Sequence, residues 1–370
     1  MRKKIQQMNE SDIRDAVRGS LIGGAIGDAL GYTIEFMRED AIFLRYGKPG
    51  ITAYELDRKT GKALFSDDTQ MTLFTAEGLL TGEACRRTQK RTEKPRCFVE
   101  KAYLDWLTTQ QLSFEEYDGK SDSRLMRVPE LFSLRAPGNT CISALFAARG
   151  LHESDPDHIE NPRNNSKGCG GVMRVAPTAL YRKPGQALRI AELDEEAAQI
   201  AAITHGHPLG YMPAAVLCHI VSRIVYPEGE RMPLRDIVLE ARDTVRALFD
   251  GFAHLDRLTE CIDLAAALSE NTDDDLDNIH LLGEGWIAEE ALAIAIYCAL
   301  RHQDDFSACM IAAVNHNGDS DSTGAIAGNI LGAWVGYEAI DGKWKTELER
   351  KDLLLEIADD LAAEAIRSAD

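Results

Sequence analysis

Residues 315–332 read NHNGDSDSTGAIAGNILG, a polar, acidic turn that passes directly into a helix of small apolar residues. Two aspartates, Asp319 and Asp321, alternate with serines at the point where this helix begins. Acidic and hydroxyl side chains at a helix N-terminus cap free N–H groups and interact favourably with the helix dipole. The same Asp-x-Asp-Ser spacing also places three oxygen donors within reach of one hard cation. This stretch alone leaves both interpretations open.

A second cluster of the same composition lies far upstream. Residues 65–80 read FSDDTQMTLFTAEGLL, in which Ser66, Asp67 and Asp68 directly precede an apolar helix. A capped helix with acidic first-turn residues accounts for this stretch alone. Adjacent aspartates at a burial boundary repel each other, however, and a cation between them relieves that repulsion. Two such clusters together supply oxygen donors that suit one or two octahedral Mg²⁺ or Mn²⁺ ions. Clusters so far apart in sequence can meet only inside one compact domain.

Glycines recur every four residues in two helical segments. The repeats are Gly19, Gly23, Gly27 and Gly31 in the first segment, and Gly324, Gly328, Gly332 and Gly336 in the second. A glycine inside a helix costs about 1 kcal/mol of helix stability relative to alanine. A ridge without side chains lets another backbone approach closely, which can offset that cost. We hypothesise that both helices are buried and central and pack against each other.

The hydrophobic pattern is helical along almost the whole chain, and alternating strand patterns are nearly absent. After a first helix over 11–31, the pattern predicts helices at 69–81, 97–110, 139–151, 194–204, 210–225, 233–250, 258–269, 285–302, 304–314, 321–337 and 350–367. We therefore predict an all-α fold in one compact domain. We expect a polar N-terminal segment at 1–11, followed by the domain at 12–370. Polar breaks at 82–96, 152–167 and 269–280 are expected to be loops between helices, and the acidic run at 273–277 is expected to be solvated surface.

Composition excludes several classes of partner. The 370-residue chain has a net charge of −19, so it repels the phosphate backbone of nucleic acid. Its eight cysteines form no Cys-x-x-Cys pair, which argues against a zinc site and a dense disulfide scaffold. No run of eighteen apolar residues predicts a membrane span, and the N-terminus is no signal peptide. We expect a cytoplasmic protein.

Further motifs have both a structural and a functional interpretation. The run KGCGGVMR at 167–174 is typical of an ordinary turn, but its N–H groups can also cradle a diphosphate. Trp286 can stack on an adenine, although a tryptophan at the start of an apolar helix is more often a core residue. A lone histidine such as His205 is more often a core or capping residue than a ligand contact. We assign no function to His207 and His316.

Together these motifs resemble the ADP-ribosylglycohydrolase family. The matching stretches are GSLIGGAIGDALGYTIEF, FSDDTQMT, APGNTC, GCGGVMRVAP, THGHPLGY, GEGWIAEEALAIAIYCAL and NHNGDSDSTGAIAGNILGA, in family order from about residue 15 to 340. The pairing of Ser-Asp-Asp-Thr with a late Gly-Asp-x-Asp-Ser is highly specific. The resemblance implies an all-α fold, a compact single-domain orthogonal helical bundle with a binuclear metal site that holds two Mg²⁺ or Mn²⁺ ions.

The resemblance also assigns residues. It implies that the metal ligands are Ser66, Asp67, Asp68, Asp319, Asp321 and Ser322. It places the active-site glutamate on Glu35, and we expect Glu35, Asp67 and Asp321 to act in catalysis. The implied substrate contacts are Glu35, Gly138, Asn139, Ser166, Gly168, Gly170, Gly171 and His205. One branch of the family has an aromatic residue and an asparagine where Lys167 and Cys169 stand, so the adenine platform differs here and Lys167 is free to pair with a phosphate.

The resemblance implies a metal-dependent hydrolase that removes ADP-ribose from modified proteins and releases it as product. Arginine is the favoured acceptor by analogy with bacterial relatives, and serine is the alternative. A rival hypothesis is an immunity-type binding protein that blocks an ADP-ribosylating toxin, with or without hydrolysis. In that case the segment before residue 12 and the loop at 82–96 are candidate contact elements.

Overall fold

The computed structural model describes residues 8–89, 93–150, 157–185 and 188–368. Parts of three expected segments, the N-terminal segment 1–11 and the breaks at 82–96 and 152–167, lie outside these residues. The described residues form helices and irregular connections, and their only β-type pairings are two isolated bridges. The prediction of an all-α fold is confirmed.

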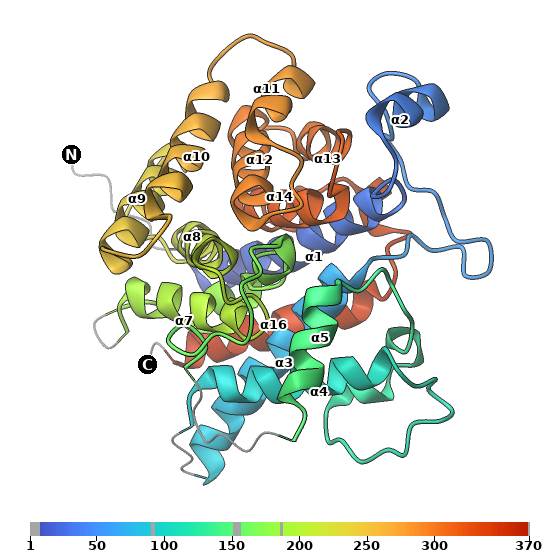
Figure 1. Cartoon of the computed structure of the whole chain (residues 1–370), viewed down its shortest axis with the longest axis vertical. Coiled ribbons are helices and arrows are strands. Elements are labelled where there is room, and N and C mark those ends of the chain that lie inside the picture. The colour runs from blue at the N-terminus through green and yellow to red at the C-terminus, as the bar shows by residue number, and fades with distance from the viewer. Residues whose placement is uncertain (1–7, 90–92, 151–156, 186–187, 369–370) are drawn as a thin grey trace.

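The helices follow one another in the order shown in Figure 1. They are α1 (Glu10–Tyr32), α2 (Glu39–Tyr46), α3 (Asp67–Gln89), α4 (Pro95–Thr109), α5 (Asn139–Ala148), α6 (Ala176–Leu180), α7 (Ile190–Ala202), α8 (Pro208–Val225), α9 (Leu234–Leu248), α10 (Leu255–Leu268), α11 (Asp275–Leu282), α12 (Ala288–Arg301), α13 (Phe306–Val314), α14 (Ser320–Val335), α15 (Gly342–Lys345) and α16 (Lys351–Arg367). Three short 3₁₀ turns are η1 (Arg124–Arg127), η2 (Pro129–Leu131) and η3 (Cys169–Gly171).

Helices α1 and α14 lie side by side at the centre of the molecule (Figure 1). Their glycines face each other in an antiparallel register. A Cβ atom on Gly19 would lie 2.1 Å from the carbonyl oxygen of Gly332, and one on Gly27 would lie 1.9 Å from that of Gly324. Such distances leave no room for any side chain. The hypothesis of two central, mutually packed glycine helices is confirmed.

The remaining helices surround this pair. Helices α12 and α13 pack on α14, while α16 packs on α1. Helix α3 packs along α4, and α8 lies between α7 and α9. By length and composition, α8 is long and apolar enough to cross a membrane. However, 89% of its 18-residue length is buried inside the protein, as in a core helix. The eight cysteines are all free.

Two sequence expectations need correction. The break at 82–96 was expected to be a loop, yet α3 continues to Gln89 and α4 begins at Pro95. Arg86, Arg87 and Thr88 are exposed on the surface of α3, while Glu83 is buried beside Arg182 at 3.6 Å. The short helices α2, α6, α11 and α15 were not predicted, because each covers at most eight residues and gives too little helical periodicity.

Candidate metal centre and ligand cavity

The central helix α1 positions the first acidic cluster. Near its C-terminal end, the fully buried Asp28 accepts hydrogen bonds from the backbone N–H groups of Ser66 at 2.8 Å and Thr69 at 2.9 Å. Ser66 directly precedes α3 and Thr69 lies in its first turn, where a helix leaves N–H groups without intrahelical partners. Asp28 therefore caps α3 from another helix and fixes Ser66, Asp67 and Asp68 relative to α1. We predicted no role for Asp28 from the sequence, because this contact depends on tertiary packing.

The second cluster begins α14. Asp319 is the N-cap residue, and its carboxylate accepts a hydrogen bond from the N–H of Ser322 at 3.2 Å. Asp321 accepts a second bond from the same N–H at 2.9 Å. The capping interpretation of the 315–332 stretch is therefore correct for Asp319. Capping uses only part of each carboxylate, so oxygen atoms remain available for a cation.

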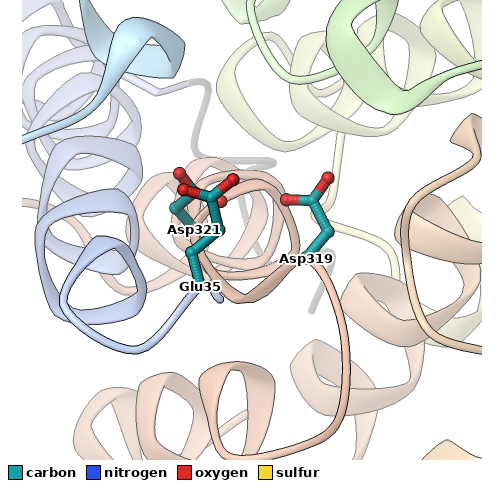
Figure 2. A group of neighbouring side chains, drawn as sticks. All are labelled: Glu35, Asp319 and Asp321. Carbon is teal, nitrogen blue, oxygen red and sulfur yellow. The ribbon is translucent and has the colours of Figure 1, made fainter. Parts of the chain in front are cut away.

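The two clusters meet beside Glu35, which lies in the turn after α1. One oxygen atom each from Glu35, Asp319 and Asp321 lies within 4.8 Å of the others, and Figure 2 shows these three side chains gathered at the start of α14. Oε2 of Glu35 and Oδ2 of Asp68 are buried and have no hydrogen-bond partner in the described part of the chain. Buried carboxylates without partners are costly unless a cation compensates them. The acidic cluster therefore fits a divalent metal site.

The electrostatics agree with this fit. Burial, followed by the negative charges of Asp319 and Asp67, raises the pKa of Glu35 to about 8. Burial, followed by the charges of Asp28 and Asp67, raises the pKa of Asp68 well above its usual range. Burial and the charge of Asp68 do the same to the pKa of Asp321. The repulsion thus acts between clusters that are distant in sequence, and positive charge at their centre would relieve it.

These carboxylates form the floor of a cavity of about 380 Å³. Six of the predicted catalytic and metal-binding residues line it, namely Glu35, Asp67, Asp68, Asp319, Asp321 and Ser322. Of the predicted substrate contacts, Gly138, Asn139, Gly168, Gly170 and His205 also line it. One cavity therefore brings together residues from six separate parts of the sequence.

Three predicted residues are not in the cavity lining. Ser66 is fully buried, and its Oγ accepts the N–H of Asp68 at 3.2 Å. Ser166 accepts the N–H of Gly168 at 3.3 Å, so its hydroxyl shapes the glycine loop. Gly171 packs against α8, where a Cβ atom would lie 2.6 Å from the carbonyl oxygen of Gly210. Their assigned contacts with metal or substrate stay predictions.

Two aromatic rings stand at the cavity opening. Trp286 is 41% exposed and Phe36 is 75% exposed, and both line the cavity. Their rings are nearly parallel, with centroids 6.4 Å apart. The expectation that Trp286 is a core residue is therefore wrong. It lies two residues before α12 begins, and the hydrogen bond from Cys169 N–H to its carbonyl oxygen at 3.2 Å fixes its backbone on the cavity rim.

The positions that depart from one family branch have partners within the protein. Lys167 lies 3.4 Å from Glu289, so its ammonium group already has an anionic partner. Cys169 donates its thiol hydrogen to Oδ2 of Asp319 at 2.7 Å. Burial, followed by the charge of Asp319, raises the pKa of this thiol well above its usual range. The sequence indicated both positions but could not indicate these contacts.

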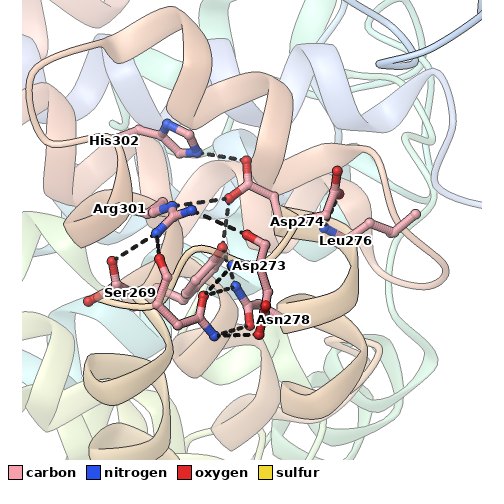
Figure 3. A network of polar contacts seen from close by, with 10 residues as sticks. Ser269, Asp273, Asp274, Leu276, Asn278, Arg301 and His302 are labelled. Carbon is pink, nitrogen blue, oxygen red and sulfur yellow. Dashed lines mark hydrogen bonds and ion pairs between the residues drawn. The ribbon is translucent and has the colours of Figure 1, made fainter.

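The acidic run at 273–277 lies away from the cavity. Asp274 caps α11, and Asp275 accepts hydrogen bonds from Tyr297 at 2.6 Å and from His302 at 2.8 Å (Figure 3). Arg301 donates to the carbonyl oxygen of Asp273 at 3.2 Å. Asp273, Asp274 and Asp277 are exposed, as expected, but the run also ties the turn before α11 to the end of α12. His316, to which we assigned no function, is fully buried among backbone carbonyl groups.

Comparison with known proteins agrees with this arrangement. The family model described as ADP-ribosylglycohydrolase matches residues 9–370. The chain belongs to the ADP-ribosylglycohydrolase family. Among ADP-ribosylglycohydrolase relatives, it is similar to the ADP-ribosyl-[dinitrogen reductase] glycohydrolase of Rhodospirillum rubrum, with 24% identity over 93% of this chain and 94% of the relative. It is also similar to the ADP-ribosylarginine hydrolase Tri1 of Serratia proteamaculans, with 23% identity over 95% of this chain and 80% of the relative.

A solved structure has the same fold. The chain matches an ADP-ribosylglycohydrolase-related protein complex with a TM-score of 0.61 and 23% identity, over 96% of this chain and 99% of the other. The predicted family and the predicted enzyme class, an ADP-ribosylglycohydrolase, are therefore confirmed.

Proposed function

We propose that this protein hydrolyses the glycosidic bond between ADP-ribose and an arginine side chain of a modified protein, with two Mg²⁺ or Mn²⁺ ions. The observation that supports this most is the meeting of both acidic clusters with Glu35 in one cavity. A cavity of about 380 Å³ with an open rim is of the size that small-molecule sites have. It can admit the nucleotide part of a substrate while the attached protein stays outside.

The protein's own residues divide the work between them. Asp67, Asp68, Asp319 and Asp321 would hold the cations, with the hydroxyl groups of Ser66 and Ser322 as further donors. Bound divalent cations in such a site orient the sugar hydroxyl groups and lower the pKa of a water molecule. The rigid contact between α1 and α14 keeps these donors at fixed separations from Glu35, as efficient catalysis requires.

Glu35 has the position of a general base. Its Oε2 has no hydrogen-bond partner and is free to accept a proton from the attacking water. As the oxygen of this water bonds to the anomeric carbon, the bond from that carbon to the arginine nitrogen breaks and the nitrogen takes up a proton. The Glu35 carboxylate also stabilises the positive charge that develops on the sugar ring. Nearby positive charge lowers the pKa of Glu35 from its metal-free value of about 8, which keeps the carboxylate ionised.

The choice of arginine rests on the relatives. Tri1 is named an ADP-ribosylarginine hydrolase, and it is similar to this chain along most of its length. The acidic cavity favours a substrate whose acceptor group is cationic, as a guanidinium group is. Serine remains the alternative acceptor, and it lacks this charge.

The test is release of free ADP-ribose. The protein is incubated with arginine-ADP-ribosylated and serine-ADP-ribosylated proteins, with Mg²⁺, with Mn²⁺ or with a chelator. We expect release from arginine that requires a cation. Release from serine alone would contradict the acceptor, and release that survives exhaustive chelation would contradict the metal mechanism.

A toxin-blocking function can be separated with one variant. If binding alone protects against an ADP-ribosylating toxin, Asp321→Ala should protect as well as the wild type. If protection depends on hydrolysis, this variant should lose protection together with ADP-ribose release.

A further inference from the structure

Arg174 is a fully buried cation beneath the cavity. No carboxylate of the described residues lies within ion-pair distance of it. Its guanidinium lies 4.5 Å from the centroid of the Tyr103 ring, and its Nη1 donates to the sulfur of Cys141 at 3.2 Å. Its Nη2 donates to the hydroxyl oxygen of Thr204 at 2.6 Å. A buried charge without an opposite charge is costly, so this arrangement calls for a reason beyond packing.

The direction of the hydrogen bonds is set by Arg174. A guanidinium group has donors and no acceptor, so the hydrogen between Arg174 and Thr204 belongs to the arginine. The hydroxyl hydrogen of Thr204 therefore points away from Arg174, towards Nδ1 of His205 or the sulfur of Cys141. Nδ1 lies 2.8 Å from the hydroxyl oxygen and is the stronger acceptor of the two, so we assign the hydrogen to this contact. Nδ1 then accepts a hydrogen bond, so it carries no hydrogen. The single hydrogen of a neutral His205 must be on Nε2.

The other side of this imidazole faces the glycine loop. A Cβ atom on Gly168 would lie 3.3 Å from Nε2 of His205, and one on Gly170 would lie 2.9 Å from its Cε1. Absence of side chains at these two positions keeps the edge of the ring open to the cavity, which His205 lines. Burial and the charge of Arg174 lower the pKa of His205 to about 3, so the ring is neutral at physiological pH. The tautomer alone then decides whether Nε2 donates or accepts.

We propose that Arg174 and Thr204 are positioning residues that hold His205 in the Nε2–H tautomer, so that it donates a hydrogen bond to an anionic ligand at the 168–171 loop. The identity of that anion, the diphosphate of ADP-ribose, rests on the proposed function. The opposite tautomer would present a lone pair to the phosphate oxygens and repel them. This relay of hydrogen bonds, from Arg174 through Thr204 to His205, thus gives one donor to an anion inside a cavity that is otherwise acidic.

Two variants separate this relay from a purely structural contact. Thr204→Val keeps the shape of the side chain and removes the hydroxyl group, whereas Thr204→Ser keeps the hydroxyl group. Thr178→Val is a matched control, because Thr178 is also fully buried and its hydroxyl group has no hydrogen-bond partner in the described residues.

The tautomer is read from the ¹⁵N chemical shifts of histidine in the free protein, and affinity is measured by calorimetry with ADP-ribose and Mg²⁺. We expect Nε2–H in the wild type, in Thr204→Ser and in Thr178→Val, and loss of this preference in Thr204→Val. The affinity of Thr204→Val for ADP-ribose should fall about tenfold, the effect of one lost hydrogen bond. The other two variants should bind as the wild type does.

Three results would overturn the inference. One is an Nδ1–H tautomer in the wild type, the second is an unchanged tautomer in Thr204→Val, and the third is an unchanged affinity in that variant. If the wild type binds no ADP-ribose, the proposed function fails, while the tautomer of the free protein still decides on the relay.

Discussion

Replacement of Gly27 by alanine should separate the two central helices. A Cβ atom at this position would lie 1.9 Å from the carbonyl oxygen and 2.3 Å from the carbonyl carbon of Gly324. Ordinary contact begins at 3.4 Å, so the local clash amounts to about 1.5 Å, the difference between 3.4 and 1.9 Å. Both opposing atoms belong to the backbone of α14, and no side chain can rotate away to make room. The helices themselves must move apart.

The magnitude follows from two opposing effects. Overpacking of a well-packed core costs about 1–3 kcal/mol, and a clash with backbone belongs at the upper end of that range. The better helix propensity of alanine returns about 1 kcal/mol. The net loss in free energy of unfolding should therefore be about 2 kcal/mol. The same movement changes the separation between Asp321 on α14 and Glu35 after α1, and a misplacement of about 1 Å can reduce a catalytic rate about 10²-fold.

The assay is urea unfolding of the metal-free protein, together with calorimetric titration of Mn²⁺ and release of ADP-ribose. Gly342→Ala is the control, because a Cβ atom at Gly342 in α15 meets no atom within 4 Å. This control should be neutral or slightly stabilising. A Gly27→Ala protein within about 0.5 kcal/mol of the wild type, the range of harmless surface changes, with unchanged Mn²⁺ affinity, would refute the close-contact reasoning.

The remaining predictions concern the acidic site. Asp68→Ala and Asp321→Ala should each lower cation affinity by more than about 100-fold, because each removes a direct ligand and loss of an outer-shell partner alone costs up to about 100-fold. Full ADP-ribose release in either variant, with an unchanged circular dichroism spectrum, would contradict the ligand assignment. Glu35→Gln should bind ADP-ribose as the wild type does while turnover falls about 10²–10⁴-fold, the contribution of a general base, and single-turnover assays at a wild-type rate would remove Glu35 from the mechanism. Metal-free protein should lose stability as pH rises from about 4.5 towards 8, since the pKa of Glu35 is raised from 4.5 to about 8 in the folded state. The folded state then binds more protons than the unfolded state across this interval, so the contribution of Glu35 to stability is full below pH 4.5 and falls as pH rises. Mg²⁺ should flatten the slope of melting temperature against pH. Equal slopes with and without Mg²⁺ would contradict the metal site.

The sequence was most informative where one physical requirement repeats. Glycines at every fourth position predicted a close helix pair, and the structure places Gly27 against Gly324. Repeated hydroxyl and carboxylate residues before apolar helices predicted one shared site, and the cavity brings Asp68 and Asp321 together. In both cases the same unusual composition occurs in two segments that are far apart in the sequence. One such segment alone would not have supported the prediction.

The sequence was least informative where a side chain acts on another element. Asp28 lies within the first glycine helix, and nothing near it in sequence indicates that it caps α3. Trp286 begins an apolar stretch that is typical of a core helix, yet the rim of the cavity leaves it 41% exposed. The polar stretch after residue 81 is helical because α3 packs along α4, and local propensity does not report such packing.

The antiparallel contact between α1 and α14 also governs when activity can appear during synthesis. Helix α1 precedes α14 in the chain, so during synthesis its glycine face stays without this partner until residue 335 has emerged. A nascent polypeptide therefore keeps this closely fitting surface bare until α14 has been made. A ribosome stalled before α14 would display neither the paired glycine helices nor a complete set of carboxylates, so partial products should be inert towards their substrate.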